Sequence, residues 1–323
     1  MKKDKLRVGV IGVGHLGEYH VQKYRANPQA ELMGIMDKRP DRAREIARKY
    51  ETRVYKTHSE LLQAVDAVSL AVPTEEHYEV AKDVLSENVH ILIEKPITYQ
   101  IEPADNLIKM AEERNLVLQV GLVERFNPAV VEMEARLKNP LFIESHRMNL
   151  FTERGTDVDV VLDLMIHDLD IILHIVPAEV KDVHAVGMTV VTGKIDIANV
   201  RMIFENGTVG NLTASRVSNS TLRKIRIFQP DAYLAVDCYR RELAVTALDG
   251  RVPASGRFRE VVSNKTKFPN RDPLADQIAS FVRAVINGTE PVVSGKDGRK
   301  ALKYALGIID QIEKGCREFQ AIC

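Results

Sequence analysis

The sequence predicts two domains: a doubly wound parallel α/β sheet over residues 1–122, and an α+β domain with a large, mostly antiparallel open sheet over residues 123–323. Two patterns predict this architecture. In the first third of the chain, short apolar runs alternate with amphipathic helical stretches. After it come longer segments of alternating polar and apolar residues, separated by turn signals. A length of 323 residues is sufficient for two domains that each have a core.

The apolar runs of the first domain are typical of strands buried on both faces, because they are nearly continuous rather than alternating. They are residues 6–11, 31–36, 67–72, 89–93 and 116–120. Helical periodicity occurs between them, at residues 15–26, 40–49, 75–87 and 100–114. Strands that alternate with helices require right-handed crossovers, and therefore a parallel sheet with both faces covered.

The pattern changes after Gly121. Residues 127–138 are a predicted helix, with Asn127 as N-cap and Pro128 in the first turn, and residues 158–175 are a largely apolar helix. The predicted strands are residues 141–151, 180–191, 197–204, 208–216, 222–228, 233–237 and 242–247. Helices near 272–287 and 296–315 close the chain, and we expect the last one to pack back on the first domain.

Composition excludes several classes of partner. Lys and Arg number 45 and Asp and Glu number 45, so we expect neither nucleic acid nor a membrane surface as a partner. Three cysteines are too few for a disulfide framework. The apolar run 8–13 follows three lysines and resembles a secretion signal, but it is short and interrupted by glycines. It is predicted to be a buried strand of a cytoplasmic protein.

Residues 12–17, Gly-Val-Gly-His-Leu-Gly, match the G-x-G-x-x-G pattern between a predicted strand and a predicted helix. Gly12 permits the tight turn, Gly14 lets a pyrophosphate approach the backbone, and Gly17 allows close packing of the helix on the strand. Asp37 ends the second strand, where a carboxylate can hold ribose hydroxyls. The pattern favours a Rossmann domain over an unrelated glycine-rich turn. Residues of the same turn are also expected at the cofactor: Val13, His15 and Leu16.

The sequence favours NAD as the cofactor, because Asp37 would repel the 2′-phosphate of NADP. Lys38, Arg39 and Arg42 follow directly and could swing outward to accept it, so NADP stays possible. Lys38 and Arg39 are counted among the cofactor-binding candidates.

Three further motifs carry a family resemblance: Glu94-Lys95-Pro96 after the fourth apolar run, residues 71–74 followed by His77, and Asp163 four residues before His167. Together with the fingerprint, they resemble the glucose–fructose oxidoreductase / inositol dehydrogenase family (Gfo/Idh/MocA) over the whole chain. The stretches 124–128 and 163–170 are most similar to the branch that acts on UDP-N-acetylglucosamine, a nucleotide-linked amino sugar. Met165 stands where the family commonly has glycine.

The resemblance implies an NAD-dependent dehydrogenase of a sugar hydroxyl, with Lys95 beside the nicotinamide and the substrate and with Asp163 and His167 as the catalytic pair. It further implies that the cofactor is lined by Val72, Pro73, Thr74, His77 and Glu94. His167 suits the role of base, because an imidazole pKa near 6.5 leaves much of it neutral at pH 7. Lys95 can polarise the oxygen, or accept the proton itself if burial lowers its pKa.

Several alternatives remain open at this point. Four polar residues of the predicted helix 158–175 are spaced by four, three and four positions: Asp163, His167, Asp170 and His174. This stripe on one helix face could hold a metal ion, although a catalytic pair explains the spacing without one. Arg125, Asn127 and Arg154 are candidate substrate ligands, since arginine suits a diphosphate. The substrate could instead be a free sugar or inositol, and a hydrolase that uses NAD transiently or a non-catalytic NAD(H)-binding regulator would share the fold. The resemblance also implies a homo-oligomer, a dimer or tetramer, assembled through the large sheet.

Overall fold

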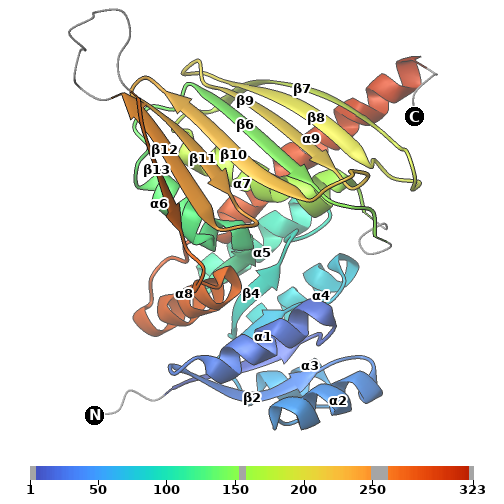
Figure 1. Cartoon of the computed structure of the whole chain (residues 1–323). Coiled ribbons are helices and arrows are strands. Elements are labelled where there is room, and N and C mark those ends of the chain that lie inside the picture. Colours follow the sequence, from blue (N-terminus) through green and yellow to red (C-terminus); the bar gives the residue numbers. More distant parts are fainter. Residues whose placement is uncertain (1–4, 153–157, 249–260, 320–323) are drawn as a thin grey trace, which may run out of the picture. The chain divides into compact units, whose positions relative to one another are not determined.

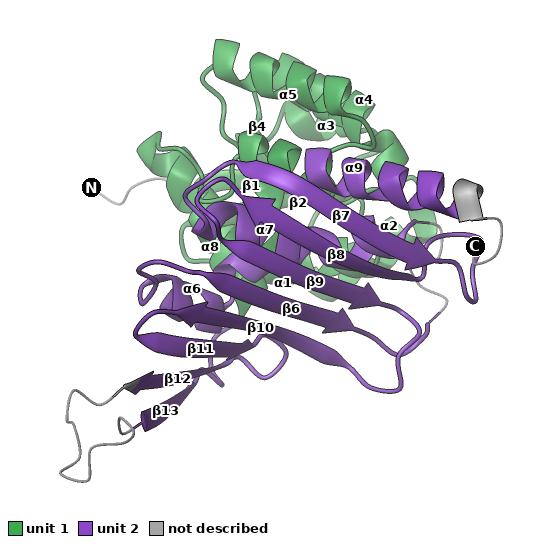
Figure 2. Cartoon of the chain, turned by 90° about the horizontal axis from the view of Figure 1, so that it is seen from above, with its two compact units in different colours: residues 1–123, 272–302 green, residues 124–271, 303–323 purple. Residues whose placement is uncertain are grey.

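The computed structural model describes residues 5–152, 158–248 and 261–319, and its elements are labelled in Figure 1. The chain divides into two compact units (Figure 2). Unit 1 consists of residues 1–123 and 272–302, and unit 2 of residues 124–271 and 303–323. Residues 272–302 thus belong with the first sheet, although they follow the whole second sheet in the sequence.

Unit 1 contains a five-stranded parallel sheet, as predicted, with strand order β2-β1-β3-β4-β5. Its strands are β1 (Leu6–Ile11), β2 (Ala30–Met36), β3 (Ala67–Leu70), β4 (His90–Glu94) and β5 (Leu118–Gly121). The chain passes from β1 to β2 on one side and then to β3 on the other side of β1. The carboxyl ends of β1 and β3 therefore flank a topological switch point, where α/β sheets bind ligands.

Six α-helices of unit 1 are described: α1 (His15–Ala26), α2 (Pro40–Tyr50), α3 (His58–Leu62), α4 (Thr74–Ser86), α5 (Ile101–Glu113) and α8 (Pro273–Asn287). Helix α3 is one short turn capped by Thr57 and was not predicted. Helix α8 is strongly amphipathic and buries Ile278, Phe281 and Val282 in the same core as Val21 and Tyr24 of α1. That contact explains why α8 belongs to unit 1.

Unit 2 contains an eight-stranded sheet in the order β13-β12-β11-β10-β6-β9-β8-β7, and only β6 and β9 pair in parallel. Its strands are β6 (Phe142–Met148), β7 (Val180–Met188), β8 (Ile197–Phe204), β9 (Val209–Ser215), β10 (Leu222–Gln229), β11 (Ala232–Asp237), β12 (Glu242–Leu248) and β13 (Val261–Lys267). The mostly antiparallel open sheet is confirmed. β13 was not predicted, because its side chains are exposed on both faces and show no alternation of polar and apolar residues.

The helical elements of unit 2 are the 3₁₀ turn η1 (Val123–Phe126), α6 (Pro128–Glu134), the π-helix η2 (Val161–Met165) and α7 (Ile166–Ile175). The long helix α9 (Gly295–Phe319) begins in unit 1 and continues into unit 2. Helix α6 contacts β11 and β12, η2 contacts β9 and α7 contacts β6, all on one face of the sheet. No helix long and apolar enough to cross a membrane occurs among the described residues.

Candidate functional site

The loop between β1 and α1 has the shape that a dinucleotide pyrophosphate requires. Gly12 has a φ of +82°, and a Cβ there would lie 2.7 Å from the carbonyl oxygen of Ala71. A Cβ at Gly17 would lie 1.9 Å from the carbonyl oxygen of Gly12, so α1 packs directly on the turn. Gly14 is the N-cap of α1, and a Cβ there would meet only the Arg39 guanidinium, at 3.8 Å. The loop leaves open backbone at a helix N-terminus, where N–H groups and the helix dipole favour an anion.

Asp37 is fixed against this loop. One carboxylate oxygen accepts the backbone N–H of Val13 at 2.8 Å, and the other accepts the backbone N–H of Arg39 at 2.9 Å and its Nε at 3.2 Å. Burial opposes ionisation, but these N–H donors and the Arg39 charge together hold the pKa of Asp37 below its usual value. A pre-positioned, ionised carboxylate at the end of β2 fits the ribose hydroxyls of NAD.

The neighbouring cations already have partners. The Arg42 Nε donates to the carbonyl oxygen of Val13 at 2.9 Å, and its guanidinium pairs with Glu18. Lys38 pairs with Glu76 at 2.8 Å. Arg42 therefore supports the outside of the glycine-rich loop, so the residues present fit NAD better than a cofactor with an additional phosphate.

The segment after β3 was expected to line the cofactor, and its residues have different environments. Pro73 is exposed, and Val72 and Thr74 are half-buried at the start of α4. His77 is 1 % exposed. Its Nδ1 lies 2.9 Å from the carbonyl oxygen of Pro96 and its Nε2 lies 3.0 Å from that of Val72. Both ring nitrogens thus contact backbone, and the ring supports the segment rather than presenting a free nitrogen to a ligand.

The Glu94-Lys95-Pro96 motif follows β4 directly. Glu94 is buried, and its Oε1 lies 3.0 Å from Nε2 of His20, a residue of α1 that is fully buried. A Cβ at Gly121 would lie 2.4 Å from the same Glu94 oxygen, so only glycine leaves room for this carboxylate. Lys95 is half-buried at the carboxyl end of β4, at the edge of the sheet that carries the glycine-rich loop.

In unit 2, the predicted pair Asp163 and His167 lies on the π-helix η2 and the start of α7. From residue 160 to residue 173, Asp163 and His167 are half-exposed and all the remaining side chains are buried. π-Helical turns frequently occur at functional sites. The helix therefore presents an accessible polar pair from an otherwise apolar, anchored element, which suits proton transfer and substrate binding.

A buried charge network supports this helix from the sheet. Arg147 of β6 donates to both oxygens of Asp168, at 2.7–3.1 Å, and to Glu124 at 2.8 Å. All three side chains are almost inaccessible. Burial opposes their ionisation, but the paired charges hold the pKa of Glu124 below and that of Arg147 above the ordinary values. Because Asp168 follows His167 directly, the network fixes the backbone at the candidate base.

Two expected substrate ligands belong to the same buried layer. Arg125 is 5 % exposed and pairs with Asp170 at 3.2 Å. Asn127 is 2 % exposed, caps α6 through Ala129, and donates to Glu124 at 3.0 Å. These polar groups have partners inside unit 2, which favours a supporting role for both residues. Arg154 lies outside the described residues.

The four residues considered as metal ligands have different partners. Asp170 pairs with Arg125, and His174 lies 2.7 Å from Glu134. Among the described residues, no three His, Cys, Asp or Glu side chains are grouped so as to hold a metal ion. Asp163 and His167 are therefore interpreted as a pair without Asp170 and His174.

His20 is a residue of this region that the sequence motifs did not identify. The buried residues of α1 are Gly17, His20, Val21 and Tyr24, a spacing of three, one and three that defines one helix face. This periodicity could have predicted that His20 lies inside, where a buried imidazole requires a polar partner.

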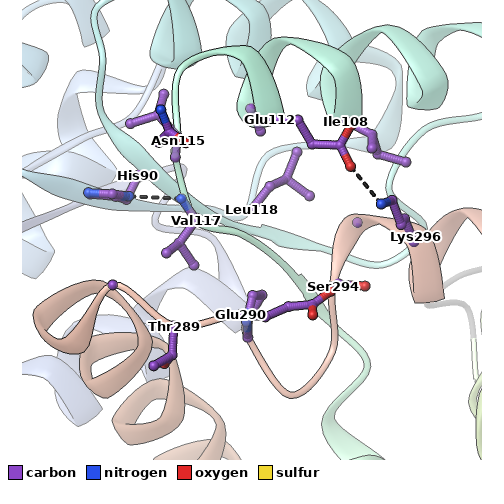
Figure 3. Close-up of a pocket in the computed structure, with 15 residues that line it drawn as sticks. His90, Ile108, Glu112, Asn115, Val117, Leu118, Thr289, Glu290, Ser294 and Lys296 are labelled. Atoms are coloured by element: carbon purple, nitrogen blue, oxygen red, sulfur yellow. Dashed lines mark hydrogen bonds and ion pairs between the residues drawn. The ribbon is translucent and has the colours of Figure 1, made fainter.

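A cavity of about 330 Å³ lies elsewhere in unit 1 and is shown in Figure 3. His90, the first residue of β4, lines it and accepts the backbone N–H of Val117 at 2.9 Å. Lys296 at its rim pairs with Glu112 at 2.7 Å. The cavity is therefore at the amino end of β4, whereas the candidate cofactor site is at the carboxyl end.

Comparisons with known proteins give matches to both parts of the chain. Residues 6–122 match the model of an oxidoreductase family with an NAD-binding Rossmann fold, and residues 129–233 match the Gfo/Idh/MocA C-terminal domain. The chain is 42 % identical to the UDP-N-acetylglucosamine 3-dehydrogenase of Acidithiobacillus ferrooxidans, over 95 % of this chain and 97 % of that protein. A crystal structure of that enzyme aligns with a TM-score of 0.89 at 40 % identity, over 97 % of this chain and 99 % of the other. The myo-inositol 2-dehydrogenase of Thermotoga maritima is 27 % identical over 92 % of this chain and 93 % of its own length.

Proposed function

The chain belongs to the Gfo/Idh/MocA oxidoreductase family, with an NAD-binding Rossmann domain, and from this premise we propose that it oxidises a secondary hydroxyl of a nucleotide-linked amino sugar. The substrate we propose is UDP-N-acetylglucosamine, oxidised at C3. One observation carries this choice: the 42 % identity to a UDP-N-acetylglucosamine 3-dehydrogenase extends over nearly the full length of both chains.

The proposed reaction requires a hydride acceptor, a proton acceptor and stabilisation of the developing alkoxide. NAD, when bound, supplies the hydride acceptor. We assign the two remaining roles to Lys95 and His167. A charged Lys95 stabilises the developing alkoxide and so lowers the pKa of the hydroxyl, and a neutral His167 accepts the hydroxyl proton. Asp163 orients the imidazole or holds a second hydroxyl of the sugar.

The cofactor is proposed to bind along the carboxyl edge of the first sheet. Gly12, Gly14 and the first turn of α1 would hold the pyrophosphate, and Asp37 would hold the adenosine ribose. Further residues proposed to contact the cofactor are Val13, His15, Leu16, Arg39, Val72, Pro73 and Thr74. Lys38 and Glu94 are proposed to act indirectly, because each is paired with another side chain.

The proposal is tested by turnover with NAD, followed as absorbance of reduced nicotinamide. UDP-N-acetylglucosamine should be oxidised, whereas free N-acetylglucosamine and myo-inositol should not. Turnover of myo-inositol alone would replace the proposal by the second candidate, which the inositol dehydrogenase relative favours. Intact NAD binding with no turnover across UDP-sugars, free sugars and inositols would indicate a regulator instead.

Lys95→Ala should reduce turnover by about 10²–10⁴-fold, the usual contribution of acid–base catalysis, with the Kd for NAD nearly unchanged. Lys109→Ala is the matched control, because Lys109 is exposed and is paired only along its own helix with Glu113. Full activity of Lys95→Ala would contradict the assignment of this lysine.

We also propose that the protein is a homo-oligomer that assembles through the large sheet. Arg147 points to the helix-covered face of β6, so the alternating residues Phe142 and Glu144 point to the other face. Phe142, Phe228 and Tyr233 form an aromatic row there, with ring centroids 5.6 and 4.8 Å apart. None of the described helices covers this row (Figure 2), which supports an interface between copies. A monomer by light scattering at micromolar concentration would contradict this.

We retain a cytoplasmic location as part of the proposal. The apolar run that resembles a secretion signal includes residues 8–11 of β1, a strand paired on both sides within the parallel sheet.

A further inference from the structure

Lys95 lies between two residues that are each held by a buried histidine. On the amino side, the Glu94 carboxylate lies 3.0 Å from Nε2 of His20. On the carboxyl side, the Pro96 carbonyl oxygen lies 2.9 Å from Nδ1 of His77. His20 is 0 % and His77 1 % exposed, so solvent screens neither contact. The two histidines come from different helices, α1 and α4, and converge on one motif.

His77 has an additional feature, because its second nitrogen also contacts a backbone carbonyl. Nε2 lies 3.0 Å from the carbonyl oxygen of Val72, the residue that follows β3 by two positions. A carbonyl oxygen can only accept, so each contact requires an N–H on the ring. The neutral ring has one N–H and serves one carbonyl at a time, whereas the imidazolium serves both. Burial lowers the pKa of His77, against the opposing effects of the two carbonyls and Glu94.

Burying a polar imidazole costs free energy unless its nitrogens make hydrogen bonds, here with the two segments on either side of the ring. An apolar side chain could fill the space, but the Pro96 and Val72 carbonyls would then lose the donor next to them, and a carbonyl shielded from water without a donor is destabilising. Both carbonyls belong to segments at the carboxyl edge of the sheet, one beside the candidate proton carrier and one beside the candidate cofactor surface.

We propose that His77 is a positioning residue of the active site. In the tautomer with its N–H at Nδ1, the ring fixes the Pro96 carbonyl and so the backbone that carries Lys95. In the tautomer with its N–H at Nε2, it fixes the cofactor-lining segment at Val72. This inference rests on the proposed function, because it gives the Lys95 position a role in proton transfer. Small displacements of a reacting group, of about 1 Å, can reduce a rate by about 10²-fold, so a fixed backbone at Lys95 has kinetic consequences.

Two substitutions separate the two contacts. His77→Asn places an amide N–H where Nδ1 lies, so it preserves the contact with Pro96 and loses the one with Val72. His77→Gln places an amide N–H where Nε2 lies, so it preserves the Val72 contact and loses the Pro96 contact. We expect kcat to fall by about tenfold or more in His77→Gln with the Kd for NAD within about threefold of wild type. We expect the opposite in His77→Asn: a kcat near wild type and a weaker Kd for NAD.

His58→Asn is the matched control, since His58 is a histidine of the same unit whose Nε2 pairs with Asp83 at 2.9 Å near the surface. It should change neither parameter. Equal losses of kcat in the two His77 variants, or a larger loss in His77→Asn, would overturn the proposal, because a merely structural role would not divide kcat from NAD affinity. If His77→Gln does not fold, the kcat of His77→Asn tests the proposal. A kcat near wild type supports it, and a fall of about tenfold or more overturns it.

A readout without turnover separates this inference from the proposed function. Amide hydrogen exchange of residues 97 and 98 should accelerate in His77→Gln and stay at the wild-type rate in His77→Asn. If the wild-type protein oxidises no sugar but exchange follows this pattern, the proposed substrate is wrong and the positioning of the motif stands. If sugar is oxidised but exchange at these residues is unchanged in His77→Gln, the positioning role is wrong.

Discussion

Substituting Gly14 tests the cofactor loop, because the structure predicts a loss of cofactor affinity with little change in stability. A Cβ at Gly14 would meet no atom closer than 3.8 Å, and its φ of −61° lies outside the left-handed region that favours glycine. Gly→Ala at a compatible position stabilises by about 0.4–1 kcal/mol through the unfolded chain. Alanine is a poorer N-cap than glycine by a similar amount, of about 1 kcal/mol. We therefore expect Gly14→Ala to unfold within about 1 kcal/mol of wild type.

The same methyl group would occupy the space through which a pyrophosphate reaches the backbone. Loss of one charge-assisted hydrogen bond costs about 1.5–3 kcal/mol, which corresponds to a Kd about 10- to 150-fold weaker. The assay is a titration with NADH followed by nicotinamide fluorescence, beside thermal unfolding of the same preparation. Gly14→Ala should lose affinity with almost no change in Tm.

Two other glycines provide the controls for this experiment. Gly17→Ala should lose both affinity and stability, because its Cβ would lie 1.9 Å from a backbone oxygen. Gly307→Ala, on α9 with nothing within 4 Å of its Cβ, should gain about 0.5–1 kcal/mol of stability and bind NADH as wild type does. Wild-type affinity in Gly14→Ala would refute the assignment of this loop to the pyrophosphate.

Two further predictions concern unit 2. Arg147→Met should reduce the free energy of unfolding by about 3–5 kcal/mol in a urea titration, because it removes the guanidinium that pairs with two buried carboxylates. Arg136→Met, which removes an exposed pair with Glu132 at the end of α6, should cost less than about 0.5 kcal/mol. The Asp196 carboxylate accepts from the Thr192 hydroxyl and three backbone N–H groups. Although burial opposes ionisation, these donors lower its pKa to about 2. The group therefore contributes about 1–2 kcal/mol above pH 4 that is lost as the pH falls towards 2, and Asp196→Asn should remove this dependence from urea titrations across that range.

The first sheet could be predicted from the sequence nearly residue by residue, because strands buried on both faces leave continuous apolar runs. The elements that were missed lack such a signal. β13 is exposed on both faces, and its segment Val261–Lys267 is bound to the sheet through backbone pairing with β12, which side-chain patterning does not report. The amphipathic pattern of α8 predicts that the helix packs on something, but the partner is Val21 and Tyr24, about 250 residues earlier, and periodicity alone cannot identify it.

The candidate site divides in the same way. Motifs identified Gly14, Asp37 and the pair Asp163 and His167 as candidates, because such positions depend on local geometry: a turn, a strand end, one helix face. They could not separate residues that face a ligand from residues that support those that do. A motif identifies both kinds alike, and only burial distinguishes Arg125, enclosed with Asp170 at 5 % exposure, from a ligand-binding arginine.

That distinction changes what the buried polar residues mean for catalysis. His77 and Arg147 differ in chemistry and lie in different units, yet each contacts the backbone or side chain adjacent to a proposed proton carrier: Pro96 beside Lys95, and Asp168 beside His167. A buried polar group without a partner destabilises the fold, whereas a fully hydrogen-bonded one is rigid. Such a contact therefore holds the neighbouring residue in one position. Lys95 and His167 are half-buried, and the positions of their side chains depend on the backbone that carries them. Substitutions in the supporting layer should therefore lower kcat through neighbours that they leave chemically intact.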